Sequence, residues 1–132
     1  MKAERFFEGD AVDSPLEPQS EQDIFDRVVR HYRKQPWRCG GGDGHCFYRG
    51  PNGDRCFVGA LLHEEFYAPE MEGVSFKSLL KAGHPFPQWM RDNAKFIGEI
   101  QQIHDSVGNW SDNRMPMILE LFAAERGLTM PA

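Results

Sequence analysis

One short stretch decides the fold that this sequence predicts. It reads His45-Cys46-Phe47-Tyr48-Arg49-Gly50-Pro51-Asn52-Gly53-Asp54-Arg55-Cys56-Phe57-Val58. Pro51 fixes its own φ at about −65°, which suits the second position of a type I turn, and Gly53 can adopt the left-handed conformation that closes a three-residue loop. A two-residue Asn52-Gly53 turn is disfavoured, because it would put Pro51 at a ladder position that needs an N–H group. The stretch therefore predicts a β-hairpin over residues 45–58.

The three-residue loop also sets the register of this predicted hairpin. It places Tyr48 opposite Cys56 and Phe47 opposite Phe57. Because side chains alternate along a strand, Cys46, Tyr48 and Cys56 should share one face. The pattern turns helical directly after the second strand, so Cys56 is expected at the start of a helix.

The rest of the chain predicts helices. Ser20 is expected to cap the first helix, and Gln35-Pro36 should end it. The predicted helices cover about 21–34, 58–66, 75–80, 88–106 and 112–126. Their expected core residues recur at helical spacing: Ile24, Phe25, Val28, Phe96, Ile100, Ile103, Val107, Ile118, Leu121 and Phe122. The predicted fold class is mainly α with one small β-hairpin, an α+β fold in a single compact domain.

Length and composition suggest one globular domain. The chain has 132 residues, of which 40% are apolar. Residues 1–19 are acidic and proline-containing without an amphipathic period, so they predict a flexible arm before a globular domain over 20–132. No apolar run approaches the roughly 20 residues of a membrane helix, and the N-terminus lacks the apolar core of a signal peptide. The cytoplasm is therefore the expected compartment.

The net charge of −5 argues against binding to a nucleic-acid backbone. An acidic protein more naturally meets a basic protein surface, so a protein is the expected partner. The candidate binding residues are the aromatic pair of the arm and the polar or aromatic residues of and after the hairpin: Phe6, Phe7, Tyr48, Arg49, Arg55, Glu64 and Glu65.

A thiol active site is one candidate for chemistry. Cys56 at a helix N-terminus can have a lowered pKa, and His104 and Asp105 could act as its base and orienting acid. Adjacent side chains on a helix project about 100° apart, however, so Asp105 is not expected to orient His104. A cysteine beside apolar Phe57 and Val58 is more often inert packing. Core packing is therefore the favoured interpretation of Cys56, and catalysis is the alternative.

A metal site is the second candidate. Cys39, Cys46 and Cys56 are an odd number of cysteines, which favours reduced thiols over a disulfide framework. Together with His45 they could supply a tetrahedral zinc set. The spacing lacks paired Cys-x2–4-Cys knuckles, and His45 and Cys46 should point to opposite faces of the hairpin. No cofactor is therefore favoured, and a small zinc-stabilised module is kept as an alternative.

The motif C-x-Y-R-G-P-x-G-x-x-C-x-x-G over residues 46–59 resembles a family of small, mostly uncharacterised proteins encoded by bacteriophages and prophages. The similarity extends to Ile24-Phe25-Asp26, Tyr67, Pro69, Met71-Glu72-Gly73, Gln102-Ile103-His104-Asp105 and Trp110. The resemblance implies an intracellular protein from a phage or phage-derived locus. Small phage proteins of this kind often bind and divert a host protein. The resemblance also implies that Cys46, Cys56, His104 and Asp105 belong to one pattern.

These observations favour a non-enzymatic accessory protein that binds a host or phage protein, for example as an inhibitor. The small size, the acidic charge, the aromatic-bearing arm and the incomplete catalytic signature all point this way. Two alternatives stay open: a thiol-dependent hydrolase or transferase, and a zinc-stabilised module.

Overall fold

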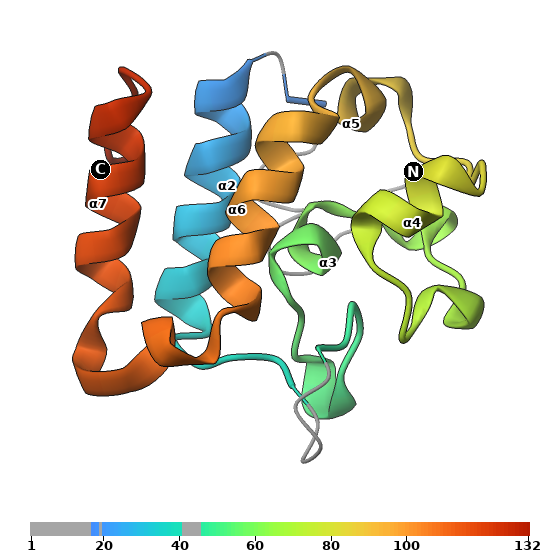
Figure 1. Cartoon of the computed structure of the whole chain (residues 1–132), viewed down its shortest axis with the longest axis horizontal. Helices are drawn as coiled ribbons and strands as arrows, with labels where there is room; N and C mark the ends of the chain where they lie inside the picture. Colours follow the sequence, from blue (N-terminus) through green and yellow to red (C-terminus); the bar gives the residue numbers. More distant parts are fainter. Residues whose placement is uncertain (1–16, 19, 41–45) are drawn as a thin grey trace.

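The computed structural model describes residues 17, 18, 20–40 and 46–132 as an assembly of helices (Figure 1). The α-helices are α2 (Glu21–Lys34), α3 (Phe57–Leu61), α4 (Phe76–Lys81), α5 (Gln88–Asp92), α6 (Ala94–Asp105) and α7 (Met115–Glu125). Shorter 3-10 helices cover Pro51–Gly53, Glu64–Phe66, Pro69–Met71 and Val107–Asn113. No helix in the described ranges is both long and apolar enough to cross a membrane. The mainly helical part of the predicted fold class is therefore confirmed.

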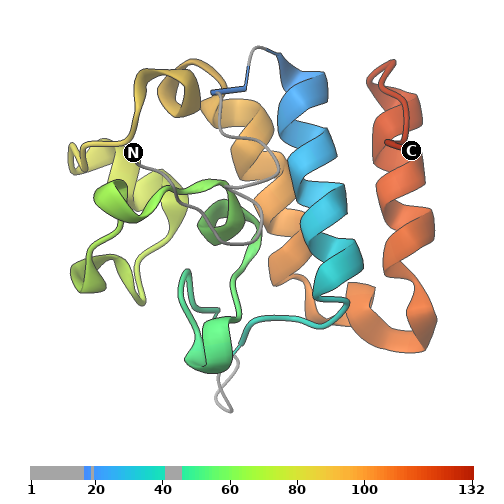
Figure 2. The same ribbon diagram turned by 180° about the vertical axis from the view of Figure 1, so that it is seen from behind.

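The three longest helices lie side by side (Figures 1 and 2). Phe122 of α7 stacks on Phe25 of α2 with ring centroids 6.0 Å apart, and it contacts Phe96 of α6 at 5.5 Å. On the other side, α3 packs against both α2 and α6, and α4 lies beyond α3. One hydrophobic core therefore runs through all of these helices.

Helix α2 begins and ends where the sequence predicts. The Ser20 hydroxyl accepts a hydrogen bond from the Asp23 N–H at 3.2 Å, as an N-cap should. The chain leaves the helix at Gln35, because the residue before a proline is disfavoured in helical conformation. The predicted core residues of this helix are fully buried: Ile24, Phe25 and Val28.

The predicted β-hairpin over residues 45–58 is wrong. From residue 46 onward the described backbone forms no strand in this stretch. The hydrogen-bond ladder of a hairpin does not form, because side chains from elsewhere in the chain bind backbone N–H groups that the ladder would use. Those of Tyr48 and Arg49 each donate to one carboxylate oxygen of Glu72 at 3.0 Å.

The opposite arm of the predicted hairpin is held by α2 in the same way. The Arg55 N–H donates to the Gln35 side-chain oxygen at 2.9 Å, and the Gln35 amide donates back to the Arg55 carbonyl at 3.0 Å. A ring nitrogen of His31 contacts the same carbonyl at 3.0 Å. Tertiary hydrogen bonds to side chains have therefore replaced the strand ladder that the local pattern predicts.

The turn at the tip does form, but as the two-residue type. Asn52 and Gly53 have φ of 62° and 83°, and the Asp54 N–H donates to the Pro51 carbonyl oxygen at 3.2 Å. Positive φ at both central residues is the signature of a type I′ turn, so the expected type I turn is wrong. The objection to Pro51 does not apply, because no ladder needs the N–H that proline lacks.

Two of the predicted helices are shorter than expected. The helix over 58–66 ends at Leu61, and the guanidinium of Arg49 binds the carbonyl oxygens of Gly59 and Leu62 at this end. The helix over 88–106 is broken at Asn93, whose side-chain amide donates to the Trp89 carbonyl at 2.7 Å. Side chains that bind helix carbonyls are typical of helix ends.

Two predicted core residues lie on the surface instead. Val107 and Leu121 are 61% and 56% exposed. Val107 follows the end of α6, and His104 takes the buried position at the end of that helix. Trp110 is half-buried, and its indole N–H donates to the His104 carbonyl oxygen at 2.8 Å.

Candidate functional site

A pocket of about 240 Å³ opens between the 46–56 stretch, the end of α6 and the 73–76 turn. Its lining combines polar and apolar side chains: Arg38, Cys46, Tyr48, Cys56, Gly73, Val74, Ser75, Phe76, Gln101 and Asp105. The predicted common face of Cys46, Tyr48 and Cys56 therefore exists as a pocket wall, although no strand pairing creates it. A concave site with a few converging polar groups is the usual form of a ligand site.

Cys46 is placed at this wall by its backbone and by an arginine. An isolated antiparallel bridge pairs Cys46 with Gly40, and the Phe47 N–H donates to the Cys39 carbonyl at 3.2 Å. The guanidinium of Arg38 donates to the Cys46 sulfur at 2.8 Å. Burial, followed by a hydrogen bond to a carboxylate, raises the pKa of the Cys46 thiol to about 12. Without a metal, Cys46 is therefore a protonated thiol at neutral pH.

His104 is the most buried polar residue of the site, with 1% of its surface exposed. Its Nε2 accepts the Cys39 N–H at 3.4 Å, and its Nδ1 lies 3.2 Å from Oδ1 of Asp105. The rings of Phe57 and Trp110 both pack edge-on against the imidazole, with ring centroids 5.0 and 5.4 Å away. Burial lowers the pKa of His104, so the ring is neutral and carries its proton on Nδ1.

Asp105 receives hydrogen bonds from several donors. The Gln101 amide donates to Oδ1 at 2.9 Å, and the His104 N–H and the Cys46 thiol also donate to the carboxylate. Burial raises the pKa of Asp105, but these three hydrogen bonds outweigh burial, and the net pKa is lowered. Gln101 is itself fixed, because its oxygen accepts the Val58 N–H at 2.8 Å. The site therefore presents an ionised, well-oriented carboxylate.

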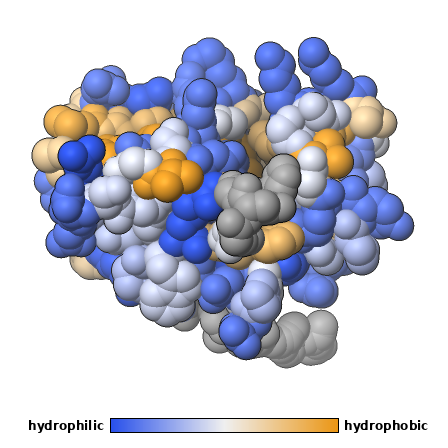
Figure 3. All heavy atoms as spheres, turned by 60° about the horizontal axis from the view of Figure 1, so that its bottom comes forward, coloured by the Kyte–Doolittle hydropathy of each residue, from blue (hydrophilic) through white to orange (hydrophobic). Residues whose placement is uncertain are grey.

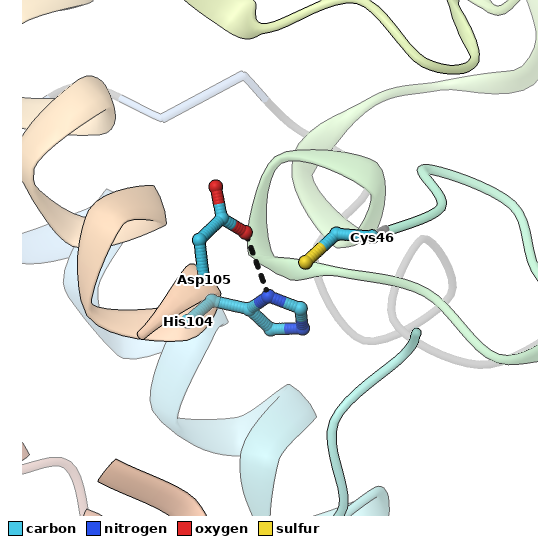
Figure 4. Close-up of side chains that lie close together, drawn as sticks. All are labelled: Cys46, His104 and Asp105. Atoms are coloured by element: carbon cyan, nitrogen blue, oxygen red, sulfur yellow. Dashed lines mark hydrogen bonds and ion pairs between the residues drawn. The ribbon is translucent and has the colours of Figure 1, made fainter. Parts of the chain in front are cut away.

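The contact between His104 and Asp105 corrects the expectation that Asp105 would not orient His104. Asp105 is the last residue of α6, and its side chain lies against the imidazole of His104 (Figure 4).

Cys46, His104 and Asp105 each offer one ligand atom, and these atoms lie within 4.8 Å of one another. Figure 4 shows the sulfur, the carboxylate and Nδ1 facing the same small space. Sulfur, imidazole nitrogen and carboxylate oxygen are the three donor types that zinc prefers in proteins. In a tetrahedral zinc site ligand atoms are about 3.5 Å apart, so the sulfur would need to move inward by up to about 1 Å.

The predicted catalytic cysteine has a different role. Cys56 is the N-cap of α3, and its sulfur accepts the Gly59 N–H at 3.3 Å. Its position at the start of a helix and in the core is confirmed, since only 1% of it is exposed. Burial raises the pKa of its thiol in spite of this helix-terminal hydrogen bond. The cysteine that approaches His104 and Asp105 is Cys46 rather than Cys56.

The zinc ligands considered from the sequence share only Cys46 with the group formed by Cys46, His104 and Asp105. Cys39 is buried, its pKa is raised to about 11 by burial and by Asp54, and its backbone N–H rather than its sulfur contacts His104. Cys56 is absent from the group. His45 lies outside the described residues.

The candidate binding residues fall into separate places. Tyr48 is buried at the pocket wall, with its hydroxyl donating to the Val74 carbonyl at 2.6 Å. Arg49 is partly buried and binds helix carbonyls, so its role is structural. Arg55 is half-buried, and its backbone is held by Gln35 and His31. Glu64 and Glu65 are exposed. Phe6 and Phe7 lie outside the described residues.

Sequence reasoning missed Arg38 and Gln101. Arg38 lies beyond the end of α2, and its guanidinium donates to the Cys46 sulfur. Gln101 precedes Asp105 by four residues on α6, the spacing at which helical side chains meet. That spacing was the available signal for its role.

No protein-family model, curated protein or solved structure matches this chain.

Proposed function

We propose that this protein is a metal-binding protein whose centre is formed by Cys46, His104 and Asp105. The observation that carries the proposal is the convergence of three chemically different ligand atoms within 4.8 Å, at the wall of a pocket. Three protein ligands with access to solvent space are typical of zinc sites that keep one coordination position open. When bound, zinc would polarise a ligand in that position and lower the pKa of a bound water.

Two of the three ligand groups carry protons when no metal is bound. The Cys46 thiol and the His104 N–H both donate to Asp105, and a metal ion would displace both protons. Gln101 would keep the carboxylate oriented, as outer hydrogen bonds do at metal sites. Binding through Nδ1 would move the single imidazole proton from Nδ1 to Nε2, which would break the long 3.4 Å hydrogen bond from the Cys39 N–H.

Cobalt titration of the full chain tests this proposal. We expect one cobalt ion to bind per chain with a thiolate-to-cobalt charge-transfer band, and NMR to show the His104 proton moving from Nδ1 to Nε2. Cys46→Ser and Asp105→Asn should each weaken cobalt binding at least ~100-fold, because a ligand is lost. The same titration with zinc should raise the melting temperature of the native chain.

Cys56→Ser is the matched control. It makes the same chemical change in the same pocket, but Cys56 is outside the ligand group and serine is a good helix N-cap. This variant should keep the cobalt affinity and the charge-transfer band. The proposal is wrong if native protein binds no cobalt, or if Cys56→Ser removes the band and Cys46→Ser does not.

A second candidate function is binding of a host or phage protein, the accessory role favoured above. Met117 and Leu121 of α7 are 55% and 56% exposed and lie one helical turn apart. Figure 3 shows apolar side chains gathered along the edge where α7 lies. Exposed Glu120 and Glu125 flank this stripe. We propose that its occupant is a partner helix with an apolar face bordered by basic residues.

Capture from bacterial lysate by variants of the full chain tests this second candidate. Leu121→Lys should abolish capture of the partner, because it adds a positive charge to the apolar stripe. Val107→Lys is the control, since Val107 is equally exposed but is not on α7. Equal capture by both variants, or a ligand that proves to be a second copy of this chain, contradicts the proposal.

A further inference from the structure

The segment that follows α7 turns back along this helix (Figure 2). Gly127 reverses the chain with a φ of 69°, and the Leu128 N–H donates to the Ala123 carbonyl oxygen at 2.9 Å. Both features are typical of a helix that ends at a glycine. Leu128 and Met130 are half-buried against the hydrophobic core, whereas Thr129 between them is exposed. The segment therefore alternates like an extended strand, with its apolar side chains on one side.

Two side chains of α2 bind the main chain of this segment. Gln22 forms a reciprocal pair with Thr129, because its amide donates to the Thr129 carbonyl at 2.8 Å and its oxygen accepts the Thr129 N–H at 2.9 Å. The guanidinium of Arg33 donates to the main-chain oxygens of Pro131 and Ala132 at 3.0 and 2.9 Å. All four hydrogen bonds involve main-chain atoms of the segment, so an extended segment of another sequence could make them equally well.

The contacts of residues 128–132 are suited to exchange. The four hydrogen bonds to α2 lie at the protein surface, where water competes for the same groups. The two apolar side chains that face the core are only half-buried. A segment with few buried contacts opens locally at a small cost in free energy. An incoming segment can therefore take its place while α2 and α7 stay packed.

We propose that the surface along α2 that residues 128–132 cover is a docking surface for an extended segment of a partner protein. The chain's own segment occupies this docking surface when the partner is absent. The partner segment carries two apolar side chains separated by one residue, in place of Leu128 and Met130, and presents its main chain to Gln22 and Arg33. Main-chain hydrogen bonds combined with sites for alternate side chains are a recurring way to recognise extended peptides. This inference does not depend on the metal centre.

A dye-labelled peptide with the sequence of residues 127–132, Gly-Leu-Thr-Met-Pro-Ala, is the probe for the docking surface. The full chain is made with the double substitution Leu128→Asp and Met130→Asp, because burying two charges is unfavourable and releases the chain's own segment. Fluorescence anisotropy should show saturable binding of the peptide to this released variant. The native chain should bind the peptide at least ~10-fold more weakly, because its tethered segment competes.

Thr129→Pro releases the segment in a second way. It removes the N–H that Gln22 accepts and keeps both apolar side chains, so it replaces the double variant if circular dichroism shows that the latter has lost its helices. A control peptide with serine in place of leucine and methionine should bind a released variant at least ~10-fold more weakly than the probe.

Substitutions on α2 of a released variant identify where the peptide binds. Gln22→Ala and Arg33→Gln should each lower the affinity for the peptide about 5-fold or more, because hydrogen bonds to the peptide main chain are lost. Arg30→Gln is the matched control, since Arg30 is exposed on the same helix and takes no part in the four hydrogen bonds. The NMR signals of the Gln22 side-chain amide should shift when the peptide binds.

Three outcomes overturn this inference. The first is that the peptide shows no saturable binding to a folded released variant, and the second is that native and released chains bind it equally. The third is that the native chain sediments as a dimer that the released variant does not form, because the docking surface would then belong to the same segment of a second copy. None of these outcomes bears on the cobalt titration of the metal centre.

Discussion

Gly59→Ala should destabilise the fold by about 3 kcal/mol or more. An alanine Cβ at this position would overlap the carbonyl oxygen of Tyr48 and lie 2.9 Å from its carbonyl carbon. Both atoms belong to the backbone, so no flexible side chain can move aside. Gly59 is also buried within α3, between the Cys56 cap and the carbonyls that Arg49 binds. Urea unfolding followed by circular dichroism measures the change in the free energy of unfolding.

Gly98→Ala is the matched control for this substitution. Gly98 lies within α6, and a Cβ there would meet no atom within 4 Å. Alanine has the higher helix propensity, so this variant should be more stable by up to about 1 kcal/mol. Opposite signs at the two helical glycines identify close backbone approach as the reason for glycine at position 59. A Gly59→Ala variant as stable as the native chain contradicts the packing of α3 against Tyr48.

Local signals predict α2 well because the interactions that define it are local. The Ser20 cap, the periodic apolar residues and the proline after Gln35 all act within a few positions of each other. The hairpin prediction failed for the opposite reason. Its turn residues do form a turn, but Glu72 and Gln35 bind the flanking backbone from 20 to 24 positions away. The sequence of the 46–58 stretch does not indicate that Glu72 and Gln35 will bind its backbone.

The sequence identified only some of the residues of the candidate site. His104 and Asp105 could be selected from the sequence, and the pocket does contain Cys46 and Cys56. Cys56 was the candidate because of its expected place at the start of a helix, which is confirmed, but the cysteine that lies beside His104 and Asp105 is Cys46. Helix geometry also argued against Asp105 orienting His104, whereas the Asp105 carboxylate lies 3.2 Å from Nδ1 of His104 at the end of α6.

Several residues in and near the 46–59 stretch have structural roles. Arg49 binds the carbonyls at the end of α3, and its guanidinium lies 5.1 Å from the ring centroid of Tyr67. Tyr67 in turn donates its hydroxyl to Glu72 at 2.8 Å. A motif that surrounds a candidate site can therefore owe its residue types to the scaffold.

Glu72→Gln should destabilise the fold by about 2–4 kcal/mol, the second large effect that we expect. The Glu72 carboxylate accepts the backbone N–H groups of Tyr48 and Arg49 and the hydroxyl of Tyr67. Hydrogen bonds to a charged acceptor are stronger than those between neutral groups. Glutamine has the same shape, but it keeps one acceptor oxygen and turns an NH₂ group toward a donor. Thermal and urea unfolding of the full chain measure the loss.

Glu70→Gln is the matched control, because Glu70 lies on the short 3-10 helix that ends directly before Glu72 and is exposed. It should change the free energy of unfolding by no more than about 0.5 kcal/mol. The two variants also differ at the candidate site. Cys46 precedes Tyr48 by two residues, so loosening the 48–49 backbone should weaken cobalt binding in Glu72→Gln and leave it unchanged in Glu70→Gln. Equal stability and equal cobalt affinity of the two variants would show that Glu72 does not hold this stretch in place, and that Cys46 is positioned by Arg38 and the bridge to Gly40 alone.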